Sequence, residues 1–257
     1  MKNLIVLLLG IVLFSAPAWS QDAQALIKQG DVFYHKFDNE QALDQYLAAL
    51  KLDKNNHEAL WKVSRAYVDI AEHMPAKTDE QEDAQLEMYE KGLEYAEKAI
   101  KANPGSMMGY LRRAIVKGRI ALFKGVFNAI SLVNDVKEDV EKAIKLGNAP
   151  SDQVAVAHYV LARAHAKVCD KPYLVRLPLG LGWGDRDVAA EEYEKAISLN
   201  PKFIMFRLDA ARNYVEMDEY QKAKDHLYKI PYLPISDEDD ERFKKEAEQL
   251  LEEIKNE

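Results

Sequence analysis

A period of 34 residues recurs near both ends of the chain. Near its start Leu26 matches Leu60, and near its end Ala189 matches Ala223. Self-similarity at this period is typical of proteins built from stacked units, each of which packs only on its neighbours. Apolar and small residues also recur with helical spacing along the chain, without the alternation typical of strands. The sequence therefore predicts an all-α protein made of repeated helix pairs.

The unit resembles the tetratricopeptide repeat (TPR), which has small residues where its two helices touch and bulky residues between them. The dipeptides Asn103-Pro104 and Asn200-Pro201 are expected to end second helices, because proline cannot continue a helix. The expected first helices carry a small residue at the eighth position of each unit, namely Gly30, Ser64, Ala114, Ala162 and Ala211. The resemblance implies a right-handed superhelix of antiparallel helix pairs.

We expect a single helical-repeat domain over residues 21–257. Three units exceed the period, and such inserts normally lie in loops or lengthened helices. Thr78 with Gln81, and Ser236 with Asp239, form capping-box patterns at expected helix starts. The last helix is charged and is expected to cap the stack. The expected units are 22–56, 57–104, 106–148, 151–201 and 202–234, followed by a capping helix at 236–255.

Four segments carry a closer resemblance, to the TPR domains of the regulator of microtubule dynamics family. They are LWKVSRA at 60–66, GLEYAEKA at 92–99, AHYVLAR at 157–163 and EAEQLL at 246–251. The resemblance implies a non-enzymatic binding domain. For animal members of the family, microtubule association or lipid handling is described.

The first 20 residues have the pattern of a signal peptide. Lys2 is followed by an apolar run from Leu4 to Phe14, and small residues lie at Ala18 and Ser20. The run covers only about half of the roughly 20 residues that a membrane-spanning helix needs. We therefore expect cleavage after Ser20, a periplasmic or secreted protein, and no integral membrane segment in the mature chain.

Composition and motifs argue against several function classes. The formal net charge of −8 disfavours a broad nucleic-acid surface. The chain lacks a metalloprotease helix, a nucleophile elbow and a phosphate-binding loop. His158 and His165 lie seven residues apart on one helical face, but both occupy positions normally used for packing. We expect no enzyme activity, no cofactor, no metal site and no nucleic-acid partner.

The first helices of a TPR stack line its concave surface, and the ninth position of each unit faces that surface. Arg65, Arg163 and Arg212 occupy this position in three units, and Arg119 lies one turn beyond it in another. Trp61 and Tyr159 occupy the adjacent fifth position. The sequence predicts a groove lined by arginine and aromatic residues that binds a peptide or protein partner. The alternative ligand is an amphipathic anionic small molecule such as a lipid. A structural alternative also stays open, in which the arginines pair with acids on neighbouring helices.

An apolar insert at 173–183 interrupts the fourth unit between its helices. It is rich in leucine, glycine and proline, so an ordinary solvated loop is not expected. We favour a plug buried against neighbouring repeats. The alternative is a lid or wall for an apolar ligand or partner, with Arg176, Leu177 and Trp183 as its binding residues.

Overall fold

The computed structural model describes residues 18–257. This range consists of helices joined by turns and loops and contains no strand. The all-α prediction is confirmed. The apolar run of the predicted signal peptide lies outside the described residues, and the predicted cleavage point after Ser20 falls in the first turn of α1. The α-helices are α1 Ala18–Tyr34, α2 Asn39–Leu52, α3 His57–His73, α4 Asp79–Ala102, α5 Met107–Lys124, α6 Ile130–Leu146, α7 Ser151–Val168, α8 Tyr173–Arg176, α9 Arg186–Leu199, α10 Ile204–Val215, α11 Tyr220–Leu227 and α12 Asp240–Glu253. Three short 3₁₀ helices also occur, η1 Val126–Asn128, η2 Leu177–Leu179 and η3 Ile230–Tyr232.

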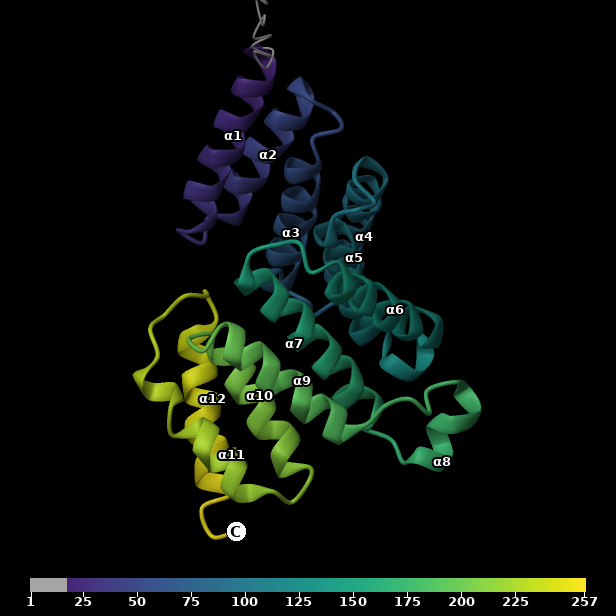
Figure 1. The fold of residues 1–257 in the computed structure, drawn as a ribbon, viewed down its shortest axis with the longest axis vertical. Helices are drawn as coiled ribbons and strands as arrows, with labels where there is room; N and C mark the ends of the chain where they lie inside the picture. Colours follow the sequence, from purple (N-terminus) through teal and green to yellow (C-terminus); the bar gives the residue numbers. More distant parts are fainter. Residues whose placement is uncertain (1–17) are drawn as a thin grey trace, which may run out of the picture.

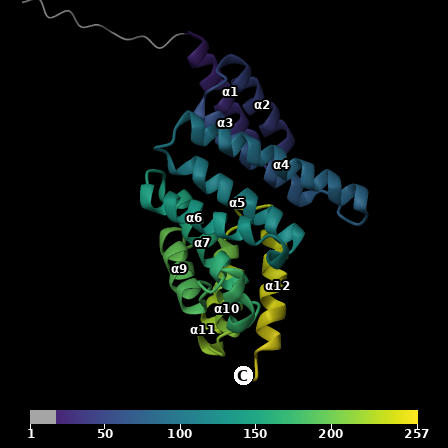
Figure 2. The same ribbon diagram turned by 90° about the vertical axis from the view of Figure 1, so that its right-hand side faces the viewer.

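The helices pack as consecutive pairs. The pairs are α1 with α2, α3 with α4, α5 with α6, α7 with α9, and α10 with α11. The second helix of each pair also packs on the first helix of the next pair, which builds a TPR-like superhelix (Figure 1). At the C-terminal end α12 contacts α10 and α11, and it lies along the lower part of the stack in Figure 2.

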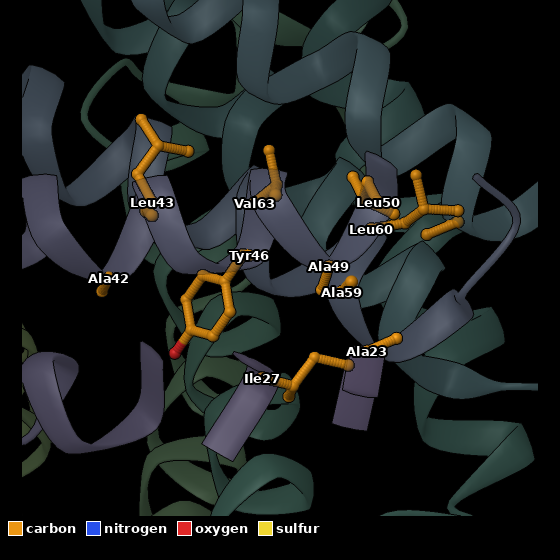
Figure 3. Packing of buried hydrophobic residues seen from close by; sticks show 12 residues of the cluster. Ala23, Ile27, Ala42, Leu43, Tyr46, Ala49, Leu50, Ala59, Leu60 and Val63 are labelled. Carbon is orange, nitrogen blue, oxygen red and sulfur yellow. The ribbon is translucent and has the colours of Figure 1, made fainter. Parts of the chain in front are cut away.

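Small residues allow the close approach of paired helices, as the sequence predicts. Gly30 is buried, and a Cβ at this position would lie 2.4 Å from Cε1 of Tyr46. The Tyr46 ring is fully buried among residues of α1, α2 and α3, with Ile27 on one side (Figure 3). Ser64, Ala114, Ala162 and Ala211 are also fully buried. These positions therefore fix the distance between helices within each unit.

Three helix ends follow the predicted signals. Thr78 is the N-cap of α4, where its side chain accepts a hydrogen bond from the backbone amide of Gln81 at 3.3 Å. Asn103 and Asn200 are the C-caps of α4 and α9. Each proline therefore follows directly after a helix, where its missing amide proton costs no helical hydrogen bond.

The capping helix starts later than the predicted position 236. The carboxylate of Asp240 accepts hydrogen bonds from the backbone amides of Ser236 at 2.7 Å and Asp237 at 2.9 Å. These bonds fold residues 236–239 into a turn, so the capping box expected for Ser236 and Asp239 does not form and α12 begins at Asp240.

The insert in the fourth unit is mostly exposed, so its predicted role as a buried plug is wrong for residues 173–179. Leu174 is 82% exposed, and Leu177 is also exposed. Only the end of the insert contacts the stack: Leu181 is fully buried and Trp183 is partly buried against the same cluster. Apolar composition predicted burial, but the short helix α8 stands out from the side of the stack (Figure 1), and the leucines on and after it are exposed.

Arg176 holds the insert together from inside. Its side chain is buried, and Nη1 donates hydrogen bonds to the carbonyl oxygens of Leu181 at 3.1 Å and Gly184 at 2.7 Å. Trp183 donates from Nε1 to Asn134 Oδ1 at 2.8 Å. Both side chains therefore make structural contacts that tie the insert to itself and to α6.

Candidate binding groove

A cavity of about 1010 Å³ runs along the concave side of the superhelix. Side chains from α1, α3, α5, α7, α10 and α12 line it, most of which are the first helices of their pairs. The six groove residues predicted from the sequence all lie on its wall, namely Trp61, Arg65, Arg119, Tyr159, Arg163 and Arg212. None of the three insert residues, Arg176, Leu177 and Trp183, is among the described residues that line it. The insert therefore does not cover this groove.

The wall of the groove combines an apolar part with a band of charges. The apolar part includes Ile115, Leu122, Val126, Val156, Val160 and Met205. The charged band includes the arginines named above together with acids from α3, α10 and α12. A ligand in the groove would therefore contact both apolar side chains and ionic groups.

Arg163 and Arg212 share an acidic partner on α10. Arg163 Nε lies 3.4 Å from Asp209 Oδ2, and its Nη1 donates to the Tyr159 hydroxyl at 3.2 Å. Tyr159 in turn donates to Asp209 at 2.8 Å, and burial raises its pKa. Arg212 pairs with Asp209 at 2.9 Å and with Glu246 at 2.6 Å.

Arg119 is also paired, with Glu72 of α3. Three of the four predicted groove arginines therefore have carboxylate partners on neighbouring helices, which is the alternative that the sequence left open. These ion pairs crosslink α3 to α5, α7 to α10, and α10 to α12. Each of these three arginines lines the cavity together with its carboxylate partner.

Arg65 is held differently. Its guanidinium carbon lies 3.4 Å from the centre of the Tyr34 ring, and Nη2 donates to the Tyr46 hydroxyl at 3.2 Å. It is only 8% exposed, and no carboxylate of the described residues lies within ion-pair distance of it. The positive charge of Arg65 is thus stabilised by ring faces and a hydroxyl group.

Arg112 of α5 is a groove residue that counting along the repeats missed. It lines the cavity beside Arg65 and is also only 8% exposed. Its Nη2 donates to Gln153 Oε1 at 2.7 Å. Arg112 lies three residues before Ile115, the ninth position of its unit, so the spacing of a helical face could have found it. Burial lowers the pKa of Arg112 to about 10, and the neighbouring positive charge of Arg65 is the second cause of this shift.

Asp69 lies on the groove wall one turn beyond Arg65. Its Oδ2 atom is shielded from solvent and has no hydrogen-bond partner among the described residues. Burial raises the pKa of Asp69 to about 7, although the positive charges of Arg65 and Arg112 act in the opposite direction. The carboxyl group of Asp69 therefore titrates near neutral pH.

The segment 233–239, which we call the closing segment, connects η3 to α12 and reaches the N-terminal half of the superhelix. Asn39 of α2 donates to Glu238 Oε1 at 3.0 Å, and His73 Nδ1 of α3 lies 3.3 Å from the same oxygen. Burial disfavours the charged form of His73, but the Asp69 carbonyl and the Glu238 carboxylate outweigh this effect and raise its pKa. Ser236 and Asp237 line the cavity. The closing segment therefore joins the two halves across the groove.

The described residues hold no group of three or more histidine, cysteine, aspartate or glutamate side chains placed to bind a metal ion. His158 pairs with Glu192, and His165 lies edge-on to Trp183 with its ring centre 5.1 Å away. Both histidines therefore have packing or ion-pair roles. Within residues 18–257, the helices are also too short or too polar for any of them to span a membrane.

Comparison with known proteins shows which family and which solved structures this chain is similar to. Residues 26–255 match the family described as regulator of microtubule dynamics protein 1-3. Regulator of microtubule dynamics protein 1 of Bos taurus is 27% identical over 249 residues, covering 93% of this chain and 74% of the bovine protein.

Two solved structures have the same arrangement of helices. A thermophilic TPR protein of Thermus thermophilus superposes with a TM-score of 0.62 at 18% identity, covering 88% of this chain and 99% of the other. Pseudomonas aeruginosa pilF superposes with a TM-score of 0.53 at 14% identity, covering 93% and 94%. These likenesses confirm the TPR-like fold.

Proposed function

This chain belongs to the regulator of microtubule dynamics protein 1-3 family, and on that basis we propose that it is a non-enzymatic binding protein whose groove holds a peptide or protein segment. The observation that supports this proposal most is the cavity of about 1010 Å³ along the first helices. Extended concave surfaces are how helical-repeat proteins bind their partners. The TPR-like fold, known for binding scaffolds, favours recognition over catalysis.

The composition of the groove wall suits a polypeptide. Its apolar part offers contacts for apolar side chains, and the pairs Arg163–Asp209 and Arg212–Glu246 place donors and acceptors along one edge. An amphipathic segment that lays its apolar face in a groove uses this combination. The paired arginines then contribute hydrogen bonds more than net charge.

A second candidate is a carrier of an amphipathic anionic small molecule such as a lipid. The closing segment favours it, because Ser236 and Asp237 line the groove while Glu238 beside them contacts Asn39 and His73 of the N-terminal half. An enclosed cavity with an apolar wall shields an aliphatic chain from water more fully than an open groove does.

Filling the groove tests both candidates. Gly118 lines the cavity, and a Cβ there would come no closer than 3.9 Å to a neighbour, Val136 Cγ2. We expect Gly118→Phe to fold and to place its ring in the groove. Native mass spectrometry of the protein purified from its own source should then show a bound peptide or small molecule on the wild type, reduced at least about tenfold on the variant.

Glu90→Phe, on an exposed face of α4, is the matched control and should retain the wild-type ligand. The mass and fragmentation of the retained ligand separate a peptide from a lipid-like molecule. Equal occupancy in wild type, Gly118→Phe and Glu90→Phe would show that the groove is not the binding site.

We also propose that the protein is exported. The support is the signal-peptide pattern of residues 1–20, with Lys2, the apolar run and the small residues before Gln21. N-terminal sequencing of the protein from its native source should find Gln21 at or near the mature end. A mature chain that keeps Leu4 to Phe14 would contradict export by cleavage.

A further inference from the structure

We propose that Arg65 and Arg112 together form a binding site for a carboxylate group of the ligand that fills the groove. The inference rests on the proposed binding function and adds the chemistry of one subsite. The two guanidinium groups lie on α3 and α5, on the same part of the cavity wall. Arg65, Arg163 and Arg212 share the ninth position of their repeats, but only Arg65 belongs to this site.

The first argument is that both charges are buried without an ion-pair partner. Each residue is only 8% exposed, and neither forms an ion pair with any described residue, unlike Arg119, Arg163 and Arg212. Moving a charged group out of water is unfavourable unless an opposite charge or hydrogen bonds compensate it. A pair of neighbouring like charges increases that cost. A bound anion would supply the missing compensation.

The second argument is that hydrogen-bond donors are left over. Nη2 of Arg65 and Nη2 of Arg112 each donate to a neighbouring side chain, but neither Nη1 atom donates to any described residue. The Nε atoms also lack an acceptor, but they are shielded from solvent, which leaves the Nη1 atoms as the donors available to a ligand. Donors on buried side chains almost always have a partner in folded proteins, so these two indicate that a ligand provides the acceptors. A planar oxyanion accepts from guanidinium groups in the two-pronged geometry that arginine favours.

Aromatic and amide side chains hold the two guanidinium groups in place. Arg65 lies on the face of Tyr34, and the Trp61 ring is 5.3 Å from Arg65 and 5.5 Å from Arg112. Gln153 fixes one end of Arg112 by its hydrogen bond. The donors are therefore preorganised, and a ligand would not have to order two flexible side chains.

The charge of the site selects a carboxylate over a phosphate. Asp69 lies close enough to influence both arginines, so two positive charges face one buried carboxyl group. Asp152 of α7 also acts on Arg112, but its side chain is exposed, so solvent screens its charge. When Asp69 is ionised the buried site has one excess positive charge, and a single negative charge balances it. The other acids near Asp69 are Glu72, which pairs with Arg119, and Asp237 of the closing segment. Lys62 is compensated by Asp31 and Glu58. A dianionic phosphate would leave the site with excess negative charge.

Nitrogen-15 NMR of the arginine side chains tests the site with sodium acetate as the probe. At about pH 8 and constant ionic strength, acetate should shift the Nε–H signals of Arg65 and Arg112 along one saturable curve. In Arg112→Gln, the affinity read from Arg65 should fall at least about tenfold, the loss that follows removal of a hydrogen bond to a charged group. Arg112→Lys should recover only part of the affinity, because lysine cannot present a two-pronged contact.

Arg207→Gln is the matched control. It removes the same charge from α10, but Arg207 is not among the described residues that line the groove, and it donates to the carbonyl oxygen of Pro201. Acetate affinity should change less than about twofold in this variant. The site is disproved if acetate leaves both Nε–H signals of the wild type unshifted, or if Arg207→Gln weakens acetate as much as Arg112→Gln does. Saturation by inorganic phosphate without saturation by acetate would disprove the choice of a carboxylate.

Retention of the natural ligand by the variants distinguishes a failure of this inference from a failure of the proposed function. If Gly118→Phe loses the ligand seen by native mass spectrometry but Arg65→Gln and Arg112→Gln retain it fully, the groove binds and the carboxylate site is wrong. If Gly118→Phe retains the ligand, the proposed groove function itself fails.

Discussion

Replacing Phe206 with alanine should lower the free energy of unfolding by about 3 to 5 kcal/mol, the usual loss when a large buried aromatic side chain is truncated. Phe206 is fully buried in α10. Its ring stacks on Tyr159 of α7 with ring centres 4.8 Å apart, and it lies 4.7 Å from the ring of Phe203. Removal of the ring would leave a cavity between the fourth and fifth helix pairs. Urea unfolding followed by circular dichroism measures the change.

Tyr232→Ala is the control for this experiment. It also removes an aromatic ring, but Tyr232 is 88% exposed, and a surface change of this kind should alter the stability by less than about 0.5 kcal/mol. A loss below about 1 kcal/mol for Phe206→Ala would mean that α7 and α10 do not share the packed core described above.

Replacing Asp69 with asparagine should make the protein less sensitive to rising pH. In the folded wild type the pKa of Asp69 is raised from 3.8 to about 7, chiefly by burial. Between these two pKa values the folded protein holds a proton that the unfolded chain has lost, so the stability falls as the pH rises. At about 1.4 kcal/mol per pH unit, the wild type should lose about 2 to 3 kcal/mol between pH 5 and pH 8 through this group. The variant should not show this loss.

The measurement is the unfolding free energy of both proteins over this pH range, with the carboxyl carbon of Asp69 followed by NMR. The groups that face Asp69 are Arg65 and Glu72 on its own helix, Arg112 on α5 and Asp237 on the closing segment. The stability of the variant relative to the wild type should therefore increase from about pH 5 to pH 8. Parallel stability curves for the two proteins would contradict the raised pKa.

The fold could be predicted because its determinants are local and periodic. Gly30 contacts Tyr46 within its own unit, and Asn103 ends its helix beside Pro104, so a pattern of 34 residues contains both partners. Amino-acid composition did not predict whether the insert is buried. Its leucines favoured burial, but Leu174 is exposed, because the placement of α8 depends on the surrounding chain.

The site could be predicted only in part. Repeat positions singled out Arg65, Arg119, Arg163 and Arg212, and all four line one cavity. They could not show which arginines have carboxylate partners, because Glu72, Asp209 and Glu246 reach Arg119, Arg163 and Arg212 from other helices. Arg163 is paired through Asp209, whereas Arg65 has ring faces around it. Arg112 was missed because it lies outside the ninth position of its unit.

The closing segment changes how this stack can deform. A stack of repeats in which each unit contacts only its neighbours behaves like a spring, since small rotations between units add up along its length. Here Glu238 contacts Asn39, 199 residues earlier in the chain, and also His73. These contacts join the C-terminal part of the superhelix to its N-terminal part, so a change in curvature must first break them. A bulky partner could enter the groove only after the contacts of Glu238 break. Its association and dissociation rates would therefore depend on how often these contacts open, more than on the strength of its contacts with the groove.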